Sequence, residues 1–213
     1  MEQINSNLEL IMMNLIKKLK TNRFVRGLYL FVIKWFGYRK GKYGYCASDV
    51  TMTPPIFISN PRNVFLMGNN GLNNACILTT NARFFMKPNS GAASGLTVVT
   101  GNHLRKVGVF YRNITEKDKP PGFDKDVVVE SDVWIGVNVT LLSGVVIGRG
   151  TTVAAGAVVN KSLPPYCICA GVPAKVIKVY WTIDQILEHE AKLYPYNERY
   201  SREELKAMLA AYL

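Results

Sequence analysis

Residues 127–162 read VVVESD-VWIGVN-VTLLSG-VVIGRG-TTVAAG-AVVNKS, six consecutive hexads in one register. The third residue of each hexad is aliphatic, and these residues are Val129, Ile135, Leu141, Ile147, Val153 and Val159. The first position is mostly aliphatic, and every hexad ends in Asp, Asn, Gly or Ser. A helix or a hairpin would give apolar periods of about 3.6 or 2 instead. The stretch therefore predicts short strands separated by turns at regular intervals.

A fixed short period of this kind is typical of a parallel β-helix, in which three hexads form one coil of a triangular prism. Corresponding residues of successive coils should then stack about 4.8 Å apart. The predicted stacked pairs are Val129–Ile147, Ile135–Val153 and Leu141–Val159. The alternative is a β-sandwich of short strands, which has no reason to keep one register over the whole stretch.

Upstream of the hexads the same pattern is degraded. Between Pro54 and Thr100, alternate apolar residues recur in pairs separated by Asn, Gly and Pro, which predicts early, irregular coils. They are Ile56, Ile58, Val64, Leu66, Cys76, Leu78, Phe84, Met86 and Val98. Residues 104–126 break the pattern with a charged segment, and a long excursion inside a compact repeat is more often functional than accidental. We therefore predict a mainly β solenoid domain over residues 46–180 with an excursion at 104–126.

Both ends of the chain are predicted to be helical. Residues 1–45 contain nine Lys and Arg against two Glu, and apolar residues recur in them with a helical period. Such a basic amphipathic extension either binds anionic lipid or packs as a cap on the solenoid or on a neighbouring subunit. Its apolar run 24–36 is shorter than the roughly 20 residues of a membrane span. Residues 181–213 predict a second helical extension, with Thr182 and Ser201 as N-caps.

Composition limits the partners and the compartment. The 213 residues are 48% hydrophobic, enough for a core, and carry a net charge of +11. Cysteines 46, 76, 167 and 169 lack zinc-type spacing, so we expect reduced core residues and no metal site. The first 22 residues begin polar and lack a signal-peptide centre, so a cytoplasmic protein is expected, at the inner membrane surface if the basic extension binds lipid. Nucleic acid is not an expected partner, because the solenoid offers no basic and aromatic stacking platform.

Four features together resemble one known family. They are the hexads, the VWIG of residues 133–136, the proline pair at 164–165 and the AGVPAKVIK of residues 170–178. They are similar to the hexapeptide-repeat acetyltransferases, and within these to the sugar and capsular-polysaccharide O-acetyltransferases related to galactoside and maltose acetyltransferases. The resemblance covers roughly residues 56–180. It implies a left-handed parallel β-helix, a homotrimer and acetyl-CoA as co-substrate, whereas parallel crossovers are otherwise right-handed.

His103 is the residue that the resemblance makes catalytic. It ends the run Thr100-Gly101-Asn102-His103, at the position where the family carries its catalytic histidine, although a lone histidine is more often structural. Acetyl transfer from a thioester to an alcohol needs a base near neutral pH, and imidazole meets this requirement. The resemblance implies direct transfer in a ternary complex, with Cys76 and Cys167 structural because neither has a Cys–His pairing. His189, among helical glutamates, is expected to be a solvated surface residue.

The resemblance also implies coenzyme contacts along the last coils. Small residues and main chain there would meet the pantetheine arm, at Val137, Ala155 and Asn160. Basic residues would meet the phosphates, at Lys161, Lys175 and Lys178. Family members often have Thr at position 160 and Arg at positions 175 and 178. Lysine binds phosphate as a point charge and lacks the bidentate geometry of arginine, so coenzyme affinity is expected to be lower while the chemistry is kept.

On the acceptor side the sequence offers weaker candidates. An oxyanion needs a hydrogen-bond donor, and Asn73, Asn74 and Asn102 are candidates for it. Trp134 is either a wall of the cleft or a structural residue. The leading hypothesis is an acetyl-CoA-dependent O-acetyltransferase that acts on a sugar, in particular a lipid-linked or nucleotide-linked precursor of a surface polysaccharide. The alternatives are an antibiotic O-acetyltransferase and a noncatalytic β-helix scaffold, and the presence of His103 argues against the scaffold.

Overall fold

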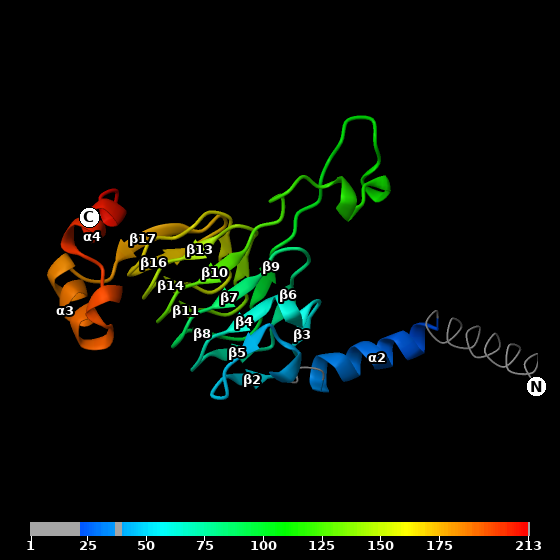
Figure 1. Ribbon diagram of the computed structural model, residues 1–213, viewed down its shortest axis with the longest axis horizontal. Coiled ribbons are helices and arrows are strands. Elements are labelled where there is room, and N and C mark those ends of the chain that lie inside the picture. The colour runs from blue at the N-terminus through cyan, green and yellow to red at the C-terminus, as the bar shows by residue number, and fades with distance from the viewer. Residues whose placement is uncertain (1–21, 37–39, 213) are drawn as a thin grey trace, which may run out of the picture.

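The protein is a mainly β solenoid of about six turns with helices at its ends, as a computed structural model shows (Figure 1). The structure describes residues 22–36 and 40–212. Helix α2 (Arg23–Phe36) lies at the end of the solenoid that holds the first coils, and helices α3 (Ile183–Leu193) and α4 (Arg202–Leu209) lie at the other end. The part of the predicted basic extension within residues 1–21 and 37–39 lies outside the described residues.

Three parallel sheets form the faces of the prism, and we call them sheets A, B and C. Sheet A consists, in order, of β1 (Tyr45–Cys46), β4 (Val64–Leu66), β7 (Phe84–Met86), β10 (Val127–Val129) and β13 (Val146–Ile147). Sheet B consists of β2 (Thr51–Thr53), β5 (Gly71–Asn73), β8 (Gly91–Ala92), β11 (Trp134–Ile135), β14 (Thr152–Val153), β16 (Cys167–Ala170) and the antiparallel β17 (Lys175–Val179). Sheet C consists of β3 (Phe57–Ile58), β6 (Cys76–Leu78), β9 (Thr97–Val99), β12 (Thr140–Leu141) and β15 (Val158–Val159).

The predicted register of the hexads is confirmed. Val129 pairs with Ile147 in sheet A, as the stacking predicts. The other two predicted pairs, Ile135–Val153 and Leu141–Val159, lie in sheets B and C. The first and third residues of all six hexads are buried and form the core. The repeat therefore holds because each coil buries the same two positions against the coil before it.

The degraded coils upstream follow the same plan with one exception in side-chain direction. Val64, Leu66, Phe84, Met86 and Val98 are buried, as the pattern suggests. In β6, however, the buried residue is Ile77, whereas Cys76 and Leu78 lie on the outer face. Successive side chains of a strand point to opposite faces, so a run of three apolar residues leaves this choice open. The expectation that all four cysteines are core residues is thus wrong for Cys76, while Cys167 and Cys169 are buried.

The C-terminal extension covers the last coil. Capping boxes begin both helices, with Thr182 and Gln185 at α3 and Ser201 and Glu204 at α4, so both predicted N-caps are confirmed. A buried ion pair joins the cap to the solenoid, because Arg149 Nη1 lies 2.8 Å from Oε2 of the fully buried Glu190. Tyr166 donates its hydroxyl to the same carboxylate.

His189 differs from its sequence expectation. Its side chain is only 24% exposed, and its ring packs on Trp181 with centroids 4.7 Å apart. Its Nε2 lies 3.3 Å from Oδ2 of Asp132. His189 is thus part of the seam between α3 and the solenoid rather than a solvated residue, because α3 lies across the coil end in a way that its own sequence does not specify.

The remaining helical turns are short. They are η1 (Lys40–Lys42), η2 (Pro61–Asn63), η3 (Tyr111–Asn113), η4 (Glu116–Asp118) and η5 (Tyr196–Glu198). Across residues 22–36 and 40–212, no helix has both the length and the apolar composition needed to cross a membrane.

Candidate active site

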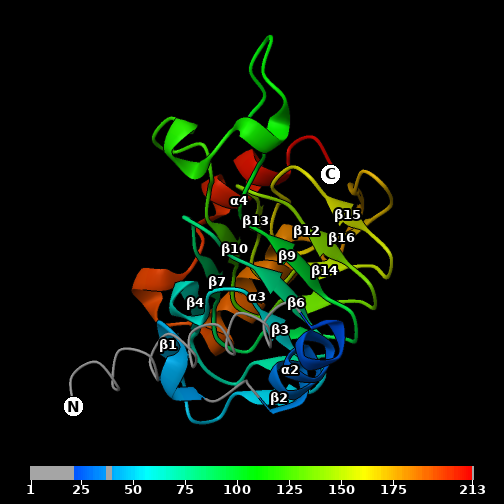
Figure 2. The same ribbon diagram turned by 90° about the vertical axis from the view of Figure 1, so that its right-hand side faces the viewer.

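The excursion leaves the solenoid at the corner where sheet C turns into sheet A. Strand β9 ends at Val99 and β10 begins at Val127, and the intervening chain projects away from the prism in both views (Figures 1 and 2). Its two ends meet, because the Lys125 N–H donates to the Thr100 carbonyl over 3.2 Å. Ser143 of the next coil joins both ends: its hydroxyl donates to Thr100 O (2.8 Å) and accepts from the Lys125 N–H (3.0 Å). The stem of the excursion is therefore fixed to the solenoid.

A buried carboxylate lies just beyond this stem. The side chain of Asp124 is 2% exposed and forms an ion pair with Lys119, whose Nζ lies 3.0 Å from Oδ2. Asp124 also accepts from the Asn102 N–H (2.8 Å) and from Nδ2 of Asn81 (3.1 Å). Burial opposes ionisation of the carboxyl, but the N–H and the ammonium outweigh it, so the pKa of Asp124 lies below its ordinary value. Glu116 completes the cluster, 2.8 Å from Lys119 Nζ.

His103 follows this network directly and lies on the surface. Its side chain is exposed, and its ring meets the edge of Tyr111 with centroids 6.4 Å apart at 77°. The Arg105 guanidinium lies over the same Tyr111 ring at 5.5 Å. A hollow of about 400 Å³ lies beside the network and is lined by Asn81, Glu116, Lys117, Lys119, Pro120, Pro121, Gly122, Phe123 and Asp124. An exposed imidazole on an anchored segment is free to meet a substrate or a second subunit.

Three of the six predicted coenzyme residues line one hollow. Asn160, Lys161 and Lys175 surround a space of about 510 Å³ at the C-terminal end of the solenoid, together with Ser162, Leu163, Pro164, Pro173, Ala174, Val176 and Tyr212. No carboxylate is among these lining residues, and two ammonium groups are. The hollow can therefore take an anionic group with room for a larger ligand.

The other three predicted coenzyme residues lie elsewhere. Val137 and Ala155 stack on each other at the corner between sheets B and C, where the Gly156 N–H donates to the Val137 carbonyl over 2.7 Å. Lys178 is exposed in β17, paired with Ile168, outside the hollow lining. Within one chain, the six predicted coenzyme residues thus do not form one site. Asn160, Lys161 and Lys175 line the hollow, Val137 and Ala155 lie at the corner between sheets B and C, and Lys178 lies in the last strand of sheet B.

The hollow and His103 share one corner of the prism. Strand pairing carries Val98 of β9 onto Leu141 of β12 and then onto Val159 of β15. Continuing that register by two residues places Lys161 two coils from Thr100, or about 10 Å along the axis. His103 therefore lies near the same edge as Lys161, whereas Lys175 pairs with Ala170 at the end of sheet B.

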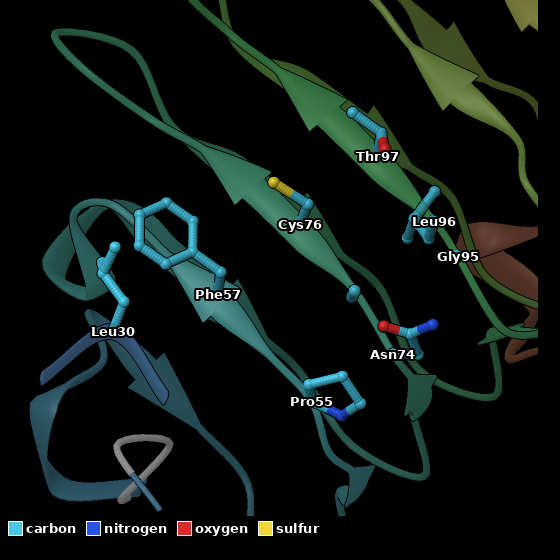
Figure 3. Close-up of a pocket in the computed structure, with 9 residues that line it drawn as sticks. Leu30, Pro55, Phe57, Asn74, Cys76, Gly95, Leu96 and Thr97 are labelled. Carbon is cyan, nitrogen blue, oxygen red and sulfur yellow. The ribbon is translucent and has the colours of Figure 1, made fainter. Parts of the chain in front are cut away.

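The acceptor-side candidates are spread out. Asn73 and Asn74 lie at the corner between sheets B and C, where their amides donate to Ala92 O (3.1 Å) and Ser94 Oγ (3.2 Å) of the next coil. Asn74 also lines a hollow of about 430 Å³ between α2 and sheet C, formed with Leu30, Phe57, Cys76 and Leu96 among others (Figure 3). This hollow is mostly apolar and its lining contains no histidine or carboxylate. Only Asn102 lies beside His103.

Trp134 and the buried cysteines complete the predicted residues. Trp134 is 53% exposed on the outer face of sheet B, close over Gly91. Burial raises the thiol pKa of Cys167 to about 11 and that of Cys169 to about 12, which makes both poor nucleophiles. In the part of the chain that the structure describes, His, Cys, Asp and Glu form no group of three or more suited to a metal ion.

Sequence reasoning missed the Asp124 network. Lys119 and Asp124 are ordinary polar residues of a charged segment, which is usually solvated, and Asn81 is one of many asparagines between the early strands. The only available signal was that the excursion interrupts a strict repeat.

The comparisons with known proteins agree with this fold. Residues 126–161 match the family described as "Bacterial transferase hexapeptide (six repeats)". The chain is 35% identical over 111 residues to a probable macrolide acetyltransferase of Lysinibacillus sphaericus, which covers 52% of this chain and 60% of that protein. It is 47% identical over 68 residues to a putative lipopolysaccharide biosynthesis O-acetyl transferase of Escherichia coli K12, covering 32% and 31%. The chain thus spans less than two thirds of the length of these relatives.

Solved structures give the same fold over a longer range. A maltose O-acetyltransferase from Clostridium difficile 630 superposes with a TM-score of 0.58 at 21% identity, over 78% of this chain and 84% of that one. A hexapeptide-repeat acetyltransferase from Vibrio cholerae in complex with acetyl-CoA gives 0.57 at 21% identity, over 76% and 92%. The matched segment therefore has the hexapeptide repeat and the solenoid fold, and the resemblance seen in the sequence is confirmed. These relatives and neighbours are acetyltransferases, a class of acyltransferases.

Proposed function

We propose that this protein is an acetyl-CoA-dependent O-acetyltransferase that acts on a hydroxyl of a sugar or surface-polysaccharide precursor, with His103 as general base. The observation that carries the proposal is that His103 follows an anchored segment at the prism edge where Lys161 lines the hollow. The likeness to acetyltransferases supports the reaction class.

The chemistry needs few groups. The acceptor oxygen attacks the thioester carbonyl, forming a C–O bond, while His103 takes the hydroxyl proton. The C–S bond then breaks, and the imidazolium returns the proton to the departing thiolate sulfur. No nucleophile of the protein enters this sequence, in keeping with the buried, high-pKa thiols of Cys167 and Cys169.

The coenzyme fits the residues present. Lys161 and Lys175 would meet its phosphates, and Asn160 would contact its chain, since all three line one hollow without a carboxylate. We also propose coenzyme contacts for Lys178, Val137 and Ala155, which lie at other edges of the solenoid. Subunits packed side by side would bring such edges together, which is one reason to propose a homotrimer.

The acceptor is proposed to bind at the excursion, residues 104–126. The hollow beside Lys119 and Phe123 offers polar groups and an aromatic ring, which suits a sugar. We therefore favour a saccharide acceptor, lipid-linked if α2 binds membrane. Antibiotic acetylation is the second candidate, favoured by the similarity to a probable macrolide acetyltransferase.

The decisive experiment is a screen of CoA release from acetyl-CoA with free sugars, lipid-linked sugars and a macrolide as acceptors. With the acceptor found, His103→Ala is expected to keep the fold and acetyl-CoA binding and to lower turnover by about 100-fold or more. Lys161→Glu with Lys175→Glu should raise the Michaelis constant for acetyl-CoA and leave that for the acceptor nearly unchanged. His189→Ala serves as the matched histidine control and should keep turnover. Wild-type turnover in His103→Ala would refute the mechanism.

A further inference from the structure

Asp124 is a buried charge that the proposed reaction does not use. Its side chain is 2% exposed and that of its ion-pair partner Lys119 is 9% exposed. Burying a charge is costly unless it is paired and hydrogen-bonded. Its donors come from three separate segments: Asn102 at the start of the excursion, Asn81 at the corner of an earlier coil, and Lys119 on the returning part.

The contact with Asn102 acts on the residue directly before His103. The Asn102 N–H donates to Asp124 Oδ1 over 2.8 Å, which fixes the plane of the peptide between Gly101 and Asn102. The chain also passes close to the solenoid at Gly101, where a Cβ would lie 2.5 Å from Thr80 Oγ1. The hydrogen bond at Asn102 and the close approach at Gly101 thus constrain the backbone that leads into His103.

We propose that Asp124 is a positioning residue for His103, and that Lys119 holds the Asp124 side chain in place. The inference rests on the proposed function of His103 as general base. Its physical basis is that a displacement of about 1 Å at a catalytic group can cost about 100-fold in rate. The competing role is purely structural, in which the ion pair only keeps the excursion folded.

Two double variants separate these roles. Asp124→Asn with Lys119→Met removes both buried charges and keeps an oxygen acceptor for the Asn102 N–H. Asp124→Leu with Lys119→Met removes both charges and the acceptor. Removing both members of a buried pair avoids leaving one charge uncompensated, so both variants should fold with melting temperatures near that of the wild type.

Turnover is measured as CoA release from acetyl-CoA, with maltose as the probe acceptor. The Asn-containing double variant should keep kcat within about threefold of the wild type, and the Leu-containing one should lose about 10- to 100-fold. The Michaelis constant for acetyl-CoA should change by less than about twofold in both, because the lysines of the coenzyme hollow are untouched. Equal kcat in the two double variants at equal stability would overturn the positioning role.

Hydrogen exchange gives a readout that needs no acceptor. The Asn102 amide should exchange slowly in the wild type and in the Asn-containing variant, and faster in the Leu-containing one. Asp118→Asn is the matched control: Asp118 is also a carboxylate of the excursion, but it binds Lys106 and the Thr115 N–H, so exchange should rise near residue 115 and not at 102. Unchanged exchange at Asn102 in the Leu-containing variant would show that the Asp124–Asn102 hydrogen bond does not protect this amide, and would overturn the proposal.

Wild-type turnover in His103→Ala would instead overturn the proposed function. The Asp124–Asn102 hydrogen bond would then have no role in catalysis.

Discussion

At the scale of single residues, two glycines at hexad ends show how neighbouring side chains restrict which residue a turn can hold. Gly150 and Gly156 both end hexads and both have positive φ, at +68° and +72°. A Cβ on Gly150 would lie 2.4 Å from Cε1 of the buried Tyr166, whereas one on Gly156 would meet nothing within 4 Å. Both positions thus require a left-handed backbone, but only Gly150 of the two also lacks space for a side chain.

We predict that Gly150→Ala destabilises the protein more than Gly156→Ala. The Gly156 variant should cost about 1 kcal/mol, from the left-handed backbone alone. The Gly150 variant should cost about 1–3 kcal/mol more, because Tyr166 is held by Glu190 and cannot move aside cheaply. Urea unfolding monitored by circular dichroism measures both free energies. Equal losses would mean that the C-terminal cap yields easily at Tyr166.

At the scale of elements, α2 presents an apolar stripe to solvent. Phe24, Leu28, Phe31 and Trp35 follow each other by four, three and four residues, which puts them on one side of a helix. All four side chains are exposed, from 41% to 79%. The sequence of α2 contains Arg23, Arg26 and Lys34 and no acidic residue. This combination favours an anionic lipid surface as the partner of α2.

We predict that Phe31→Ser with Trp35→Ser abolishes sedimentation with vesicles of phosphatidylserine and phosphatidylcholine at low salt, where attraction is least screened. Folding should be unaffected, because both side chains are exposed. Val107→Ser, at an exposed apolar residue of the excursion, is the control and should leave sedimentation unchanged. If α2 instead packs on a neighbouring subunit, the wild type will not sediment with vesicles and the double variant will change the oligomer size.

At the scale of the whole molecule, the faces of the prism differ in the residues that they turn outward. Sheet C turns outward Thr97 and Thr140 and, for the rest, apolar residues: Phe57, Cys76, Leu78, Val99, Leu142 and Val158. Sheet B turns outward Thr51, Asn73 and Thr152 beside Trp134, and sheet A turns outward Tyr45, Phe65, Phe85, Val128 and Val146. An apolar sheet face on a solenoid favours contact with another subunit. His103 lies at one edge of sheet C, so such contact would place it beside a second chain.

We predict that the protein is a trimer in solution and that Leu142→Arg converts it to a monomer of 23.8 kDa. A charge buried in an apolar interface costs several kcal/mol when unpaired. Thr51→Arg, on sheet B, is the control and should leave the trimer intact. Light scattering coupled to gel filtration gives the masses, and activity should fall with the trimer. A monomeric wild type would remove sheet C as an interface.

The sequence by itself determined the solenoid, the register of its strands and the N-caps of the two C-terminal helices. Val129 stacks on Ile147 because each hexad buries the same two positions, so a local pattern repeated along the chain is enough to fix contacts between coils. Capping boxes are equally local, with Thr182 and Ser201 bonded within three residues. In β6 the sequence pattern was not enough, because alternation along three apolar residues did not show whether Ile77 or its two neighbours would be buried.

Only the tertiary structure decided what surrounds His103 and the coenzyme hollow. Asp124 meets Asn102 and Asn81 across 22 and 43 residues of chain, and no periodic pattern relates these positions. The hollow likewise joins Lys161 and Lys175 to Tyr212 through a reversed last strand and a C-terminal cap. Such contacts depend on where an irregular segment returns to the solenoid. That return is set by the burial of a few charges and hydrogen bonds between distant residues, and a sequence pattern does not record them.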